Sequence, residues 1–399
     1  MHNVRNVTDD IYSIGGDDRV LSLFENIHPI PEGISYNSYL LLDEETVLFD
    51  TVDLNIADNF IENVKQVLDG RKLDYLVVNH MEPDHAGSIG LIQDIYPDIK
   101  VIGNKKTFDL MEQFNYKVNE SDIIVKDGDT MSFGKHELVF ISAPMVHWPE
   151  TMATFDKTDG VLFSADAFGT FKSLDGKLFN DEVEFEKDFL VPARRYYTNI
   201  VGKYGPQVQK LLSKASELDI KYICPLHGPV WRTNLEYIID KYDKWSRYEP
   251  EEEGVLIVYG SMYGNTEKAA EDLAKRLVEK GMTNIAMYDS SKTHVSYLVS
   301  DAFKYSHIVL ACATYNLNIY TPVRDFLLDI ENQHLKDRTV GIIENGSWAP
   351  TSGKLMREIL ERMKGMEVLD ESFLITSSMK QEDAPKMEAL ADSIIATLK

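Results

Sequence analysis

The chain has 399 residues, of which 44% are hydrophobic and 27% charged, a composition typical of a soluble globular protein. This length predicts two or three domains with ample size to bury a core. The formal net charge of −24 argues against nucleic acid or an anionic membrane surface as partner, because like charges repel. We find no apolar run of the ~20 residues that span a bilayer and no signal peptide. The two cysteines, Cys224 and Cys312, suggest no disulfide framework, so we expect a cytoplasmic protein.

The first half of the chain mixes strand and helix patterns. Strands are expected at residues 11–14, 36–42, 46–50 and 73–79. Between the last two lies a helix with one apolar stripe, formed by Phe60, Ile61, Val64, Val67 and Leu68. Strands with helices between and around them predict helices packed on the faces of sheets.

The segment directly after residues 73–79 contains four potential metal ligands, namely His80, Glu82, Asp84 and His85. In an extended chain His80, Glu82 and Asp84 project to one side, and a turn into the next helix can bring His85 to the same side. These are too many ligands for one metal that leaves room for a substrate, so we predict two metals. The carboxylate of Glu82 favours a redox-active metal such as iron over zinc.

This run resembles the H-x-E-x-D-H motif of the flavodiiron proteins, which replaces the H-x-H-x-D-H zinc motif of metallo-β-lactamase-like domains. Three single residues, His147, Asp166 and His227, follow apolar strand patterns farther along the chain, as the family requires. The resemblance implies an N-terminal αββα sandwich of the metallo-β-lactamase type.

The resemblance also implies how the ligands divide between two irons, which would act in catalysis. The first iron would be held by His80, Glu82 and His147. The second would be held by Asp84, His85 and His227. Asp166 would bridge the pair.

Each of these residues also has an ordinary structural interpretation. Asp84 could cap a helix, His147 and His227 could be buried hydrogen-bonded histidines, and Asp166 could be a turn residue. Their joint occurrence in the expected order favours the metal site. Cys224 lies close to His227, and a small apolar residue at a strand end is preferred to a further ligand.

A break at residues 249–254, which contain four glutamates, a proline and a glycine, predicts a linker between domains 1–248 and 255–399. Strands are then expected at residues 255–259, 284–288, 307–311, 339–343 and 373–376, with a closing helix near residues 384–398. The continuous apolar run at 255–259 is typical of a strand buried on both faces of a parallel sheet. The alternation predicts a flavodoxin-like, doubly wound sheet with strand order 2-1-3-4-5.

Three loops of this second domain lie at expected carboxyl ends of strands, where ligands bind in open α/β sheets. The first has no lysine, so it is not a nucleoside triphosphate loop, and it resembles the S/T-x-x-G-x-T phosphate loop of flavodoxins. The loops consist of Ser261, Met262, Tyr263, Gly264, Asn265 and Thr266; of Thr314, Tyr315, Asn316, Leu317 and Asn318; and of Asn345, Gly346, Ser347 and Trp348. We predict that they bind FMN, with Tyr315 and Trp348 against the flavin ring.

The resemblance covers nearly the whole chain and implies the two-domain class of A-type flavoproteins, without a C-terminal rubredoxin module. It implies a cytoplasmic oxidoreductase in which FMN feeds electrons to the di-iron site. The substrate would be oxygen, reduced to water, or nitric oxide, reduced to nitrous oxide, for oxygen or nitrosative detoxification. The implied partners are an external electron donor (a rubredoxin, a small flavoprotein or a reduced deazaflavin) and a second copy, in a head-to-tail homodimer or dimer of dimers.

Two rival interpretations remain. One is a zinc hydrolase fused to a flavodoxin, against which Glu82 counts. The other is an electron carrier or redox sensor with a vestigial metal site, which should lack a ligand, whereas none is missing. The roles of Glu25, His28, Tyr196 and Tyr197 near the expected pocket stay open at this point.

Overall fold

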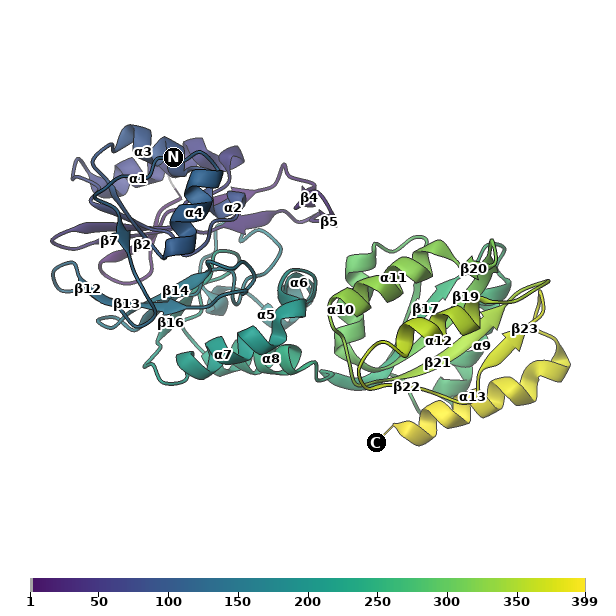
Figure 1. Cartoon of the computed structure of the whole chain (residues 1–399). Helices are drawn as coiled ribbons and strands as arrows, with labels where there is room; N and C mark the ends of the chain where they lie inside the picture. Colours follow the sequence, from purple (N-terminus) through teal and green to yellow (C-terminus); the bar gives the residue numbers. More distant parts are fainter. Residues whose placement is uncertain (1–2, 399) are drawn as a thin grey trace. The chain divides into compact units, whose positions relative to one another are not determined.

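The computed structural model describes residues 3–398 and divides into two compact units (Figure 1). The first unit comprises residues up to Tyr197 together with Pro206–Asp243. The second comprises Thr198–Gly205 together with the chain from Lys244 onward. The metallo-β-lactamase-like sandwich and the flavodoxin-like sheet predicted from the sequence are both confirmed.

The first unit is built around two mixed sheets. The seven-stranded sheet has the order β1 (Arg5–Asn6), β2 (Ile11–Ser13), β7 (Tyr39–Leu42), β8 (Thr46–Phe49), β9 (Tyr75–Val77), β10 (Lys100–Gly103) and β11 (Ile123–Ile124). The five-stranded sheet has the order β12 (Thr130–Ser132), β13 (Glu137–Ser142), β14 (Met152–Asp156), β15 (Val161–Phe163) and β16 (Tyr222–Cys224). Side chains of both sheets form one apolar core, in which the rings of Phe49 and Phe163 stack 3.8 Å apart.

Helices cover this sandwich on its outer faces. In Figure 1, α1 (Ala57–Leu68) and α3 (Ile89–Ile95) lie above the sheets, and α7 (Gly205–Ala215) and α8 (Leu235–Arg247) below them. The remaining helices are α2 (Pro83–Ala86), α4 (Lys105–Gln113), α5 (Phe185–Asp188) and α6 (Leu190–Tyr196). Two small hairpin-like sheets, β3 (Gly16–Asp18) with β6 (Ile34–Tyr36) and β4 (Leu23–Phe24) with β5 (His28–Pro29), complete the unit.

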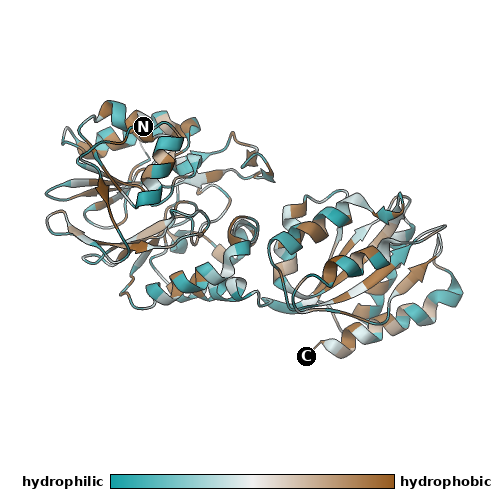
Figure 2. Cartoon of the chain, viewed as in Figure 1, coloured by the Kyte–Doolittle hydropathy of each residue, from teal (hydrophilic) through white to brown (hydrophobic). Residues whose placement is uncertain are grey.

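The second unit is a parallel sheet with helices on both faces, in the predicted order 2-1-3-4-5. The strands are β18 (Ile285–Asp289), β17 (Glu252–Gly260), β19 (Tyr305–Tyr315), β21 (Arg338–Asn345), and a final strand split into β22 (Met366–Val368) and β23 (Phe373–Ile375). The helices are α9 (Asn265–Glu279), α10 (Val295–Lys304), α11 (Thr321–Asn332), α12 (Ser352–Leu360) and α13 (Ala384–Thr397). The central strands are mainly hydrophobic and the outer faces of the helices are hydrophilic, as a doubly wound sheet requires (Figure 2).

The segment predicted as a linker is only partly irregular. Helix α8 runs to Arg247, and β17 begins at Glu252, inside the range 249–254. Two side chains hold the connection: the indole of Trp245 donates to Glu251, and the buried guanidinium of Arg338 donates to the Tyr248 carbonyl at 2.8 Å. The acidic run therefore includes an exposed strand end. Among the described residues, no helix is both long and apolar enough to cross a membrane.

An ionic bridge at His136 joins the two sheets of the first unit. This fully buried side chain lies just before β13, with Nδ1 3.1 Å from Asp156 in β14 and Nε2 3.2 Å from Asp10 beside β2. Burial opposes the charged imidazolium, but the hydrogen bonds to Asp156 and Asp10 outweigh it and raise the pKa of His136 above 6.5. A raised pKa means that the bridge contributes its full stability below the pKa of the unfolded chain and loses it as pH rises through the folded pKa.

We therefore expect His136→Gln to lower the free energy of unfolding of the first unit by roughly 2 kcal/mol at pH 6. The deficit relative to wild type should shrink towards alkaline pH, where wild-type His136 is also neutral. Denaturant titrations of both proteins from pH 6 to 9 measure this. A deficit that is the same at every pH would contradict the charged bridge.

Candidate functional site

The predicted metal ligands all follow the carboxyl ends of strands in the first unit. His80 comes after β9, and Glu82 immediately precedes α2, whose first turn holds Asp84 and His85. Pro83 at the first helical position favours this abrupt change from strand to helix. His147, Asp166 and His227 follow β13, β15 and β16, respectively.

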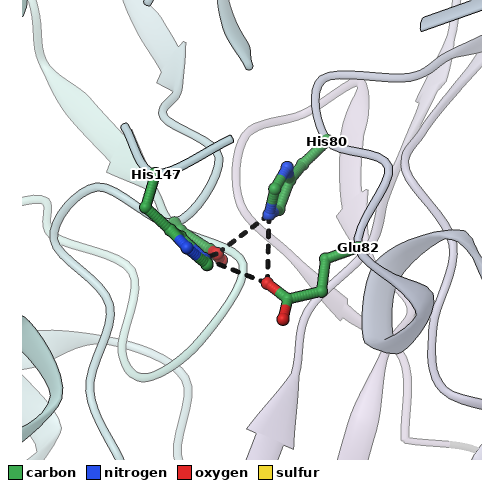
Figure 3. Close-up of side chains that lie close together, drawn as sticks. His80, Glu82 and His147 are labelled. Carbon is green, nitrogen blue, oxygen red and sulfur yellow. Dashed lines mark hydrogen bonds and ion pairs between the residues drawn. The ribbon is translucent and has the colours of Figure 1, made fainter. Parts of the chain in front are cut away.

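The side chains of His80, Glu82, His147 and Asp166 form the first cluster. Figure 3 shows His80, Glu82 and His147 pointing toward one another. The Nε2 atoms of His80 and His147 lie 3.3 and 3.0 Å from Oε2 of Glu82. The same two nitrogens lie 3.2 and 3.1 Å from Oδ2 of Asp166. The four ligand atoms therefore all lie within 4.8 Å of one another, close enough to hold one metal ion.

Asp84, His85 and His227 form the second cluster. Oδ2 of Asp84 lies 3.2 Å from Nε2 of His85 and 3.3 Å from Nε2 of His227. The other oxygen of Asp166, Oδ1, lies 3.1 Å from Nε2 of His85. Asp166 therefore offers one oxygen to each cluster, which is the arrangement of a bridging carboxylate.

The chemistry of the clusters fits metal ions. Both oxygens of Asp84 and Oδ1 of Asp166 are buried, and among the described residues the close contacts with His85 and His227 do not make hydrogen bonds to them. This is costly for a carboxylate without a cation. Burial opposes ionised Glu82 and Asp166, yet the adjacent histidines hold the pKa of both carboxyls well below their usual range. Burial likewise opposes protonated His147, but Asp166 and Glu82 raise its pKa to about 9. The ionised carboxylates of Glu82 and Asp166 are therefore stabilised by positive charge close to them, either on the histidines or on a metal ion.

Further residues orient the ligands. Nδ1 of His80 lies 2.9 Å from the fully buried carboxylate of Glu150, which also accepts from the Met81 backbone. Asp50, at the end of β8, accepts from the backbone of Asn79 and His80. The sequence analysis did not identify Glu150 or Asp50, although a carboxylate directly after a strand was a usable signal for Asp50. Such partners fix the orientation of a ligating ring.

The two candidate tyrosines occupy different surroundings. The ring of Tyr196 lies 5.3 Å from that of His227, and its buried hydroxyl has no hydrogen-bond partner among the residues described. Burial and then Asp166 raise its pKa, so the phenol stays protonated. Gly169 permits the close approach, because a Cβ there would lie 2.8 Å from the Tyr196 ring. Tyr197 instead packs edge-on against Tyr242.

The turn of the β4–β5 hairpin brings Glu25 to the first cluster. Partial burial, and then the neighbouring carboxylate of Glu82, raise the pKa of Glu25 to about 8, although 32% of the Glu25 side chain is exposed. His28 lies on the same hairpin, with Nε2 3.7 Å from Glu25. Phe24, on the same hairpin, packs edge-on against His227, with the ring centroids 5.5 Å apart.

A cavity of about 360 Å³ lies at the carboxyl ends of the strands in the second unit, a size suited to a small ligand. All three predicted loops reach it. Its lining is Ser261, Met262, Tyr263, Asn265, Thr266, Ala313, Thr314, Asn316, Leu317, Asn345, Gly346, Ser347, Trp348 and Ser377.

The lining differs from the prediction at several positions. Tyr315 and Asn318 lie outside it because β19 and β20 (Asn318–Ile319) pair as a hairpin, and alternate side chains of a strand point to opposite faces. Tyr315 packs edge-on against Tyr320, and its position against the flavin ring stays a prediction. Ser377, which the sequence analysis missed, joins the lining from beyond β23.

The first loop is shaped for an anion. Gly264 has a φ of +86° directly before α9, a backbone conformation that favours glycine. The Ser261 hydroxyl accepts from the Gly264 backbone at 3.0 Å, and Asn345 donates to the Thr266 hydroxyl at 3.2 Å. The loop thus faces the cavity at the N-terminus of a helix, where a phosphate binds favourably. Gly264 itself shapes the turn and does not line the cavity.

Comparisons with known proteins match both units. Residues 34–228 match the family model described as ODP family beta lactamase, and residues 257–388 match the flavodoxin model. A nitric oxide reductase of Moorella thermoacetica is 31% identical over 361 residues, covering 90% of each chain.

Solved structures agree along almost the whole length. Rubredoxin oxygen:oxidoreductase from Desulfovibrio gigas is 27% identical, with a TM-score of 0.92 over 98% of each chain. A variant of the flavo di-iron protein from Thermotoga maritima is 28% identical, with a TM-score of 0.91 over 99% of this chain and 98% of that one. The chain therefore belongs to the flavodiiron protein family, a class of oxidoreductases with FMN and a di-iron site as cofactors.

Proposed function

We propose that this protein reduces oxygen to water, nitric oxide to nitrous oxide, or both, for oxygen or nitrosative detoxification. The observation that carries the proposal is the pair of buried ligand clusters that share Asp166, with Glu82 where a zinc site would have a histidine. The names of the Moorella and Desulfovibrio relatives, one a nitric oxide reductase and one an oxygen oxidoreductase, support the two substrates.

The ligands divide between two iron positions in this proposal. His80, Glu82 and His147 would hold the first iron, Asp84, His85 and His227 would hold the second, and Asp166 would offer one oxygen to each. FMN would bind in the cavity of the second unit, which is lined by residues of the loop Ser261–Thr266 and of the two neighbouring loops. When bound, these cofactors supply the electrons and the binding place for the gas.

In this proposal, the aromatic side chains beside the second cluster exclude water, and one of them donates a hydrogen bond to the substrate. The rings of Phe24 and Phe171 pack against Tyr196 and close one side of the second cluster. The Tyr196 hydroxyl stays protonated and has no partner among the residues described, so it is free to donate to a bound substrate. Exclusion of water strengthens such a hydrogen bond.

The proposed partners follow from the same family membership. An external donor, namely a rubredoxin, a small flavoprotein or a reduced deazaflavin, reduces the FMN. A head-to-tail homodimer or dimer of dimers places the flavin of one subunit against the irons of the other. The exposed side chain of Trp348, on the rim of the cavity, is available for such a contact.

The function is tested on anaerobically purified protein. We expect two irons and one FMN per chain, together with consumption of oxygen or nitric oxide by chemically reduced protein. Parallel electrode measurements with each gas give the preference between them. Zinc without iron, combined with ester or thioester hydrolysis, would instead support the rival hydrolase.

Replacing Glu82 with histidine tests the choice of metal. The nitrogen-rich set of Glu82→His should favour zinc over iron, so we expect loss of iron and a fall in gas reduction of at least about 100-fold. Metal analysis and gas consumption measure both effects. Glu62→His, on the exposed surface of α1, is the control and should behave as wild type. Unchanged iron content in Glu82→His would contradict the assigned ligand.

Replacing Tyr196 with phenylalanine separates function from stability. The hydroxyl has no partner among the described residues, so its removal should leave the melting temperature unchanged or raise it. Loss of a hydrogen bond to the substrate should nevertheless slow turnover roughly 10-fold, which corresponds to about 1.4 kcal/mol. The matched control is Tyr197→Phe, because the ring of Tyr197 packs against Tyr242. Equal turnover in the two variants would remove the proposed role of Tyr196.

A further inference from the structure

The loop that carries His227 is held by one short segment of the chain. This segment, Ser35–Asn37, runs from β6 towards β7, and the loop is Pro225–Gly228, directly after β16. The Asn37 backbone donates to the Leu226 carbonyl at 2.8 Å, and the Leu226 backbone donates to the Ala165 carbonyl at 3.0 Å. The loop is thereby fixed between the segment and the residue that precedes Asp166.

Asn37 makes the central contacts with its side chain. Its Nδ2 donates to the carbonyl of Pro225 at 2.9 Å and to the carbonyl of Gly228 at 2.8 Å. These two acceptors flank His227 on either side, and Asn37 is only 4% exposed. Both protons of the amide are therefore used to define the curvature of the loop.

Ser35 then sets the orientation of the histidine ring. Its carbonyl accepts from Nδ1 of His227 at 2.7 Å, and its hydroxyl accepts from the Gly228 backbone at 2.6 Å. A proton on Nδ1 leaves the lone pair of the neutral ring on Nε2, which faces Asp84 and His85. Displacement of the loop would turn this lone pair away from the second cluster.

We infer that Asn37 is a positioning residue for the second metal position, acting through the loop of His227. The inference rests on the proposed di-iron site. The first position depends on other supports, because Glu150 orients His80 and Asp50 holds the backbone of Asn79 and His80. Loss of Asn37 therefore weakens one of the two positions selectively.

The substitution Asn37→Asp isolates the amide protons from the packing. Aspartate has the same size, but its carboxylate cannot donate to the carbonyls of Pro225 and Gly228 and would face two oxygens in a buried site. The loop must move to relieve this repulsion. Loss of a partner that orients a ligand weakens metal binding roughly 10–100-fold.

A matched control exists in the same unit. Asn63 is 2% exposed, and its Nδ2 also donates to two backbone carbonyls, of Ile14 at 2.9 Å and Gly15 at 3.3 Å. Asn63→Asp therefore imposes the same chemical change at a place where no hydrogen bond reaches the His227 loop. Any general destabilisation by a buried aspartate should appear in both variants.

The test is an anaerobic chelator titration of the FMN-loaded full chains, with total transition metal and FMN measured per chain. We expect Asn37→Asp to lose about half of its metal at chelator concentrations 10–100-fold below those needed for wild type and Asn63→Asp. Partial oxidation should also yield less of the electron paramagnetic resonance signal of a mixed-valent iron pair, since this signal requires both positions. FMN content should not change.

The outcomes are distinct. Metal retention in Asn37→Asp equal to that of wild type would overturn the inference, as would equal metal loss from the Asn37→Asp and Asn63→Asp proteins. Loss of both metals together from Asn37→Asp would overturn the selectivity for the second position. A wild-type protein that holds fewer than two metals would instead count against the proposed di-iron site.

Discussion

The structure of the first unit depends on one constraint, the burial of several carboxylates around Asp166. One oxygen of Asp166 faces His80 and His147, and the other faces His85. Such a concentration of negative charge away from water is strongly unfavourable unless cations compensate it. The histidines can compensate by taking protons, which is the reason for the raised pKa of His147. Metal ions compensate without protons, and they leave the imidazole lone pairs free to act as ligands.

The fold meets this constraint by delivering each ligand from a rigid strand end and by orienting it from behind. The ligands follow the ends of four strands from the two sheets, namely β9, β13, β15 and β16. Side chains of these strands are buried in the core that both sheets share, which fixes the strands in place. Behind the ligands, Glu150 holds His80, and Ser35 with Asn37 holds the loop of His227. The same sandwich frame that binds zinc in hydrolases can therefore present a set richer in carboxylate, because the identity of the metal is decided by a few side chains at strand ends.

The second unit must also accommodate negative charge, in this case that of a bound phosphate, without a cationic side chain in the loop. A phosphate brings negative charge to an already acidic chain, and the loop offers no lysine against it. In the proposed FMN site, the phosphate would be held by the N-terminus of α9 and by neutral donors such as Ser261, Asn265 and Thr266, which line the cavity. Neutral donors bind the anion by hydrogen bonds whose strength depends on geometry more than on net charge. The left-handed Gly264 and the bond between Asn345 and Thr266 contribute to the geometry of this loop.

The sequence by itself determined the features that are local or periodic. The run from His80 to His85 shows its metal chemistry within six residues, and its resemblance to the flavodiiron motif implied the sandwich of the first unit. Strand–helix alternation with a glycine turn predicted the flavodoxin-like sheet of the second. Tertiary structure decided what depends on distant segments meeting. No sequence pattern links Glu150 or Asn37 to His80 or His227, and the position of Asp50 after a strand does not say which residue it contacts. Hydrogen bonds across 29 to 191 positions are set only when the sheets pack. Strand pairing likewise placed Tyr315 outside the lining of the cavity in the second unit, since a hairpin assigns alternate side chains to opposite faces. The chain beyond β23 brings Ser377 into the same lining.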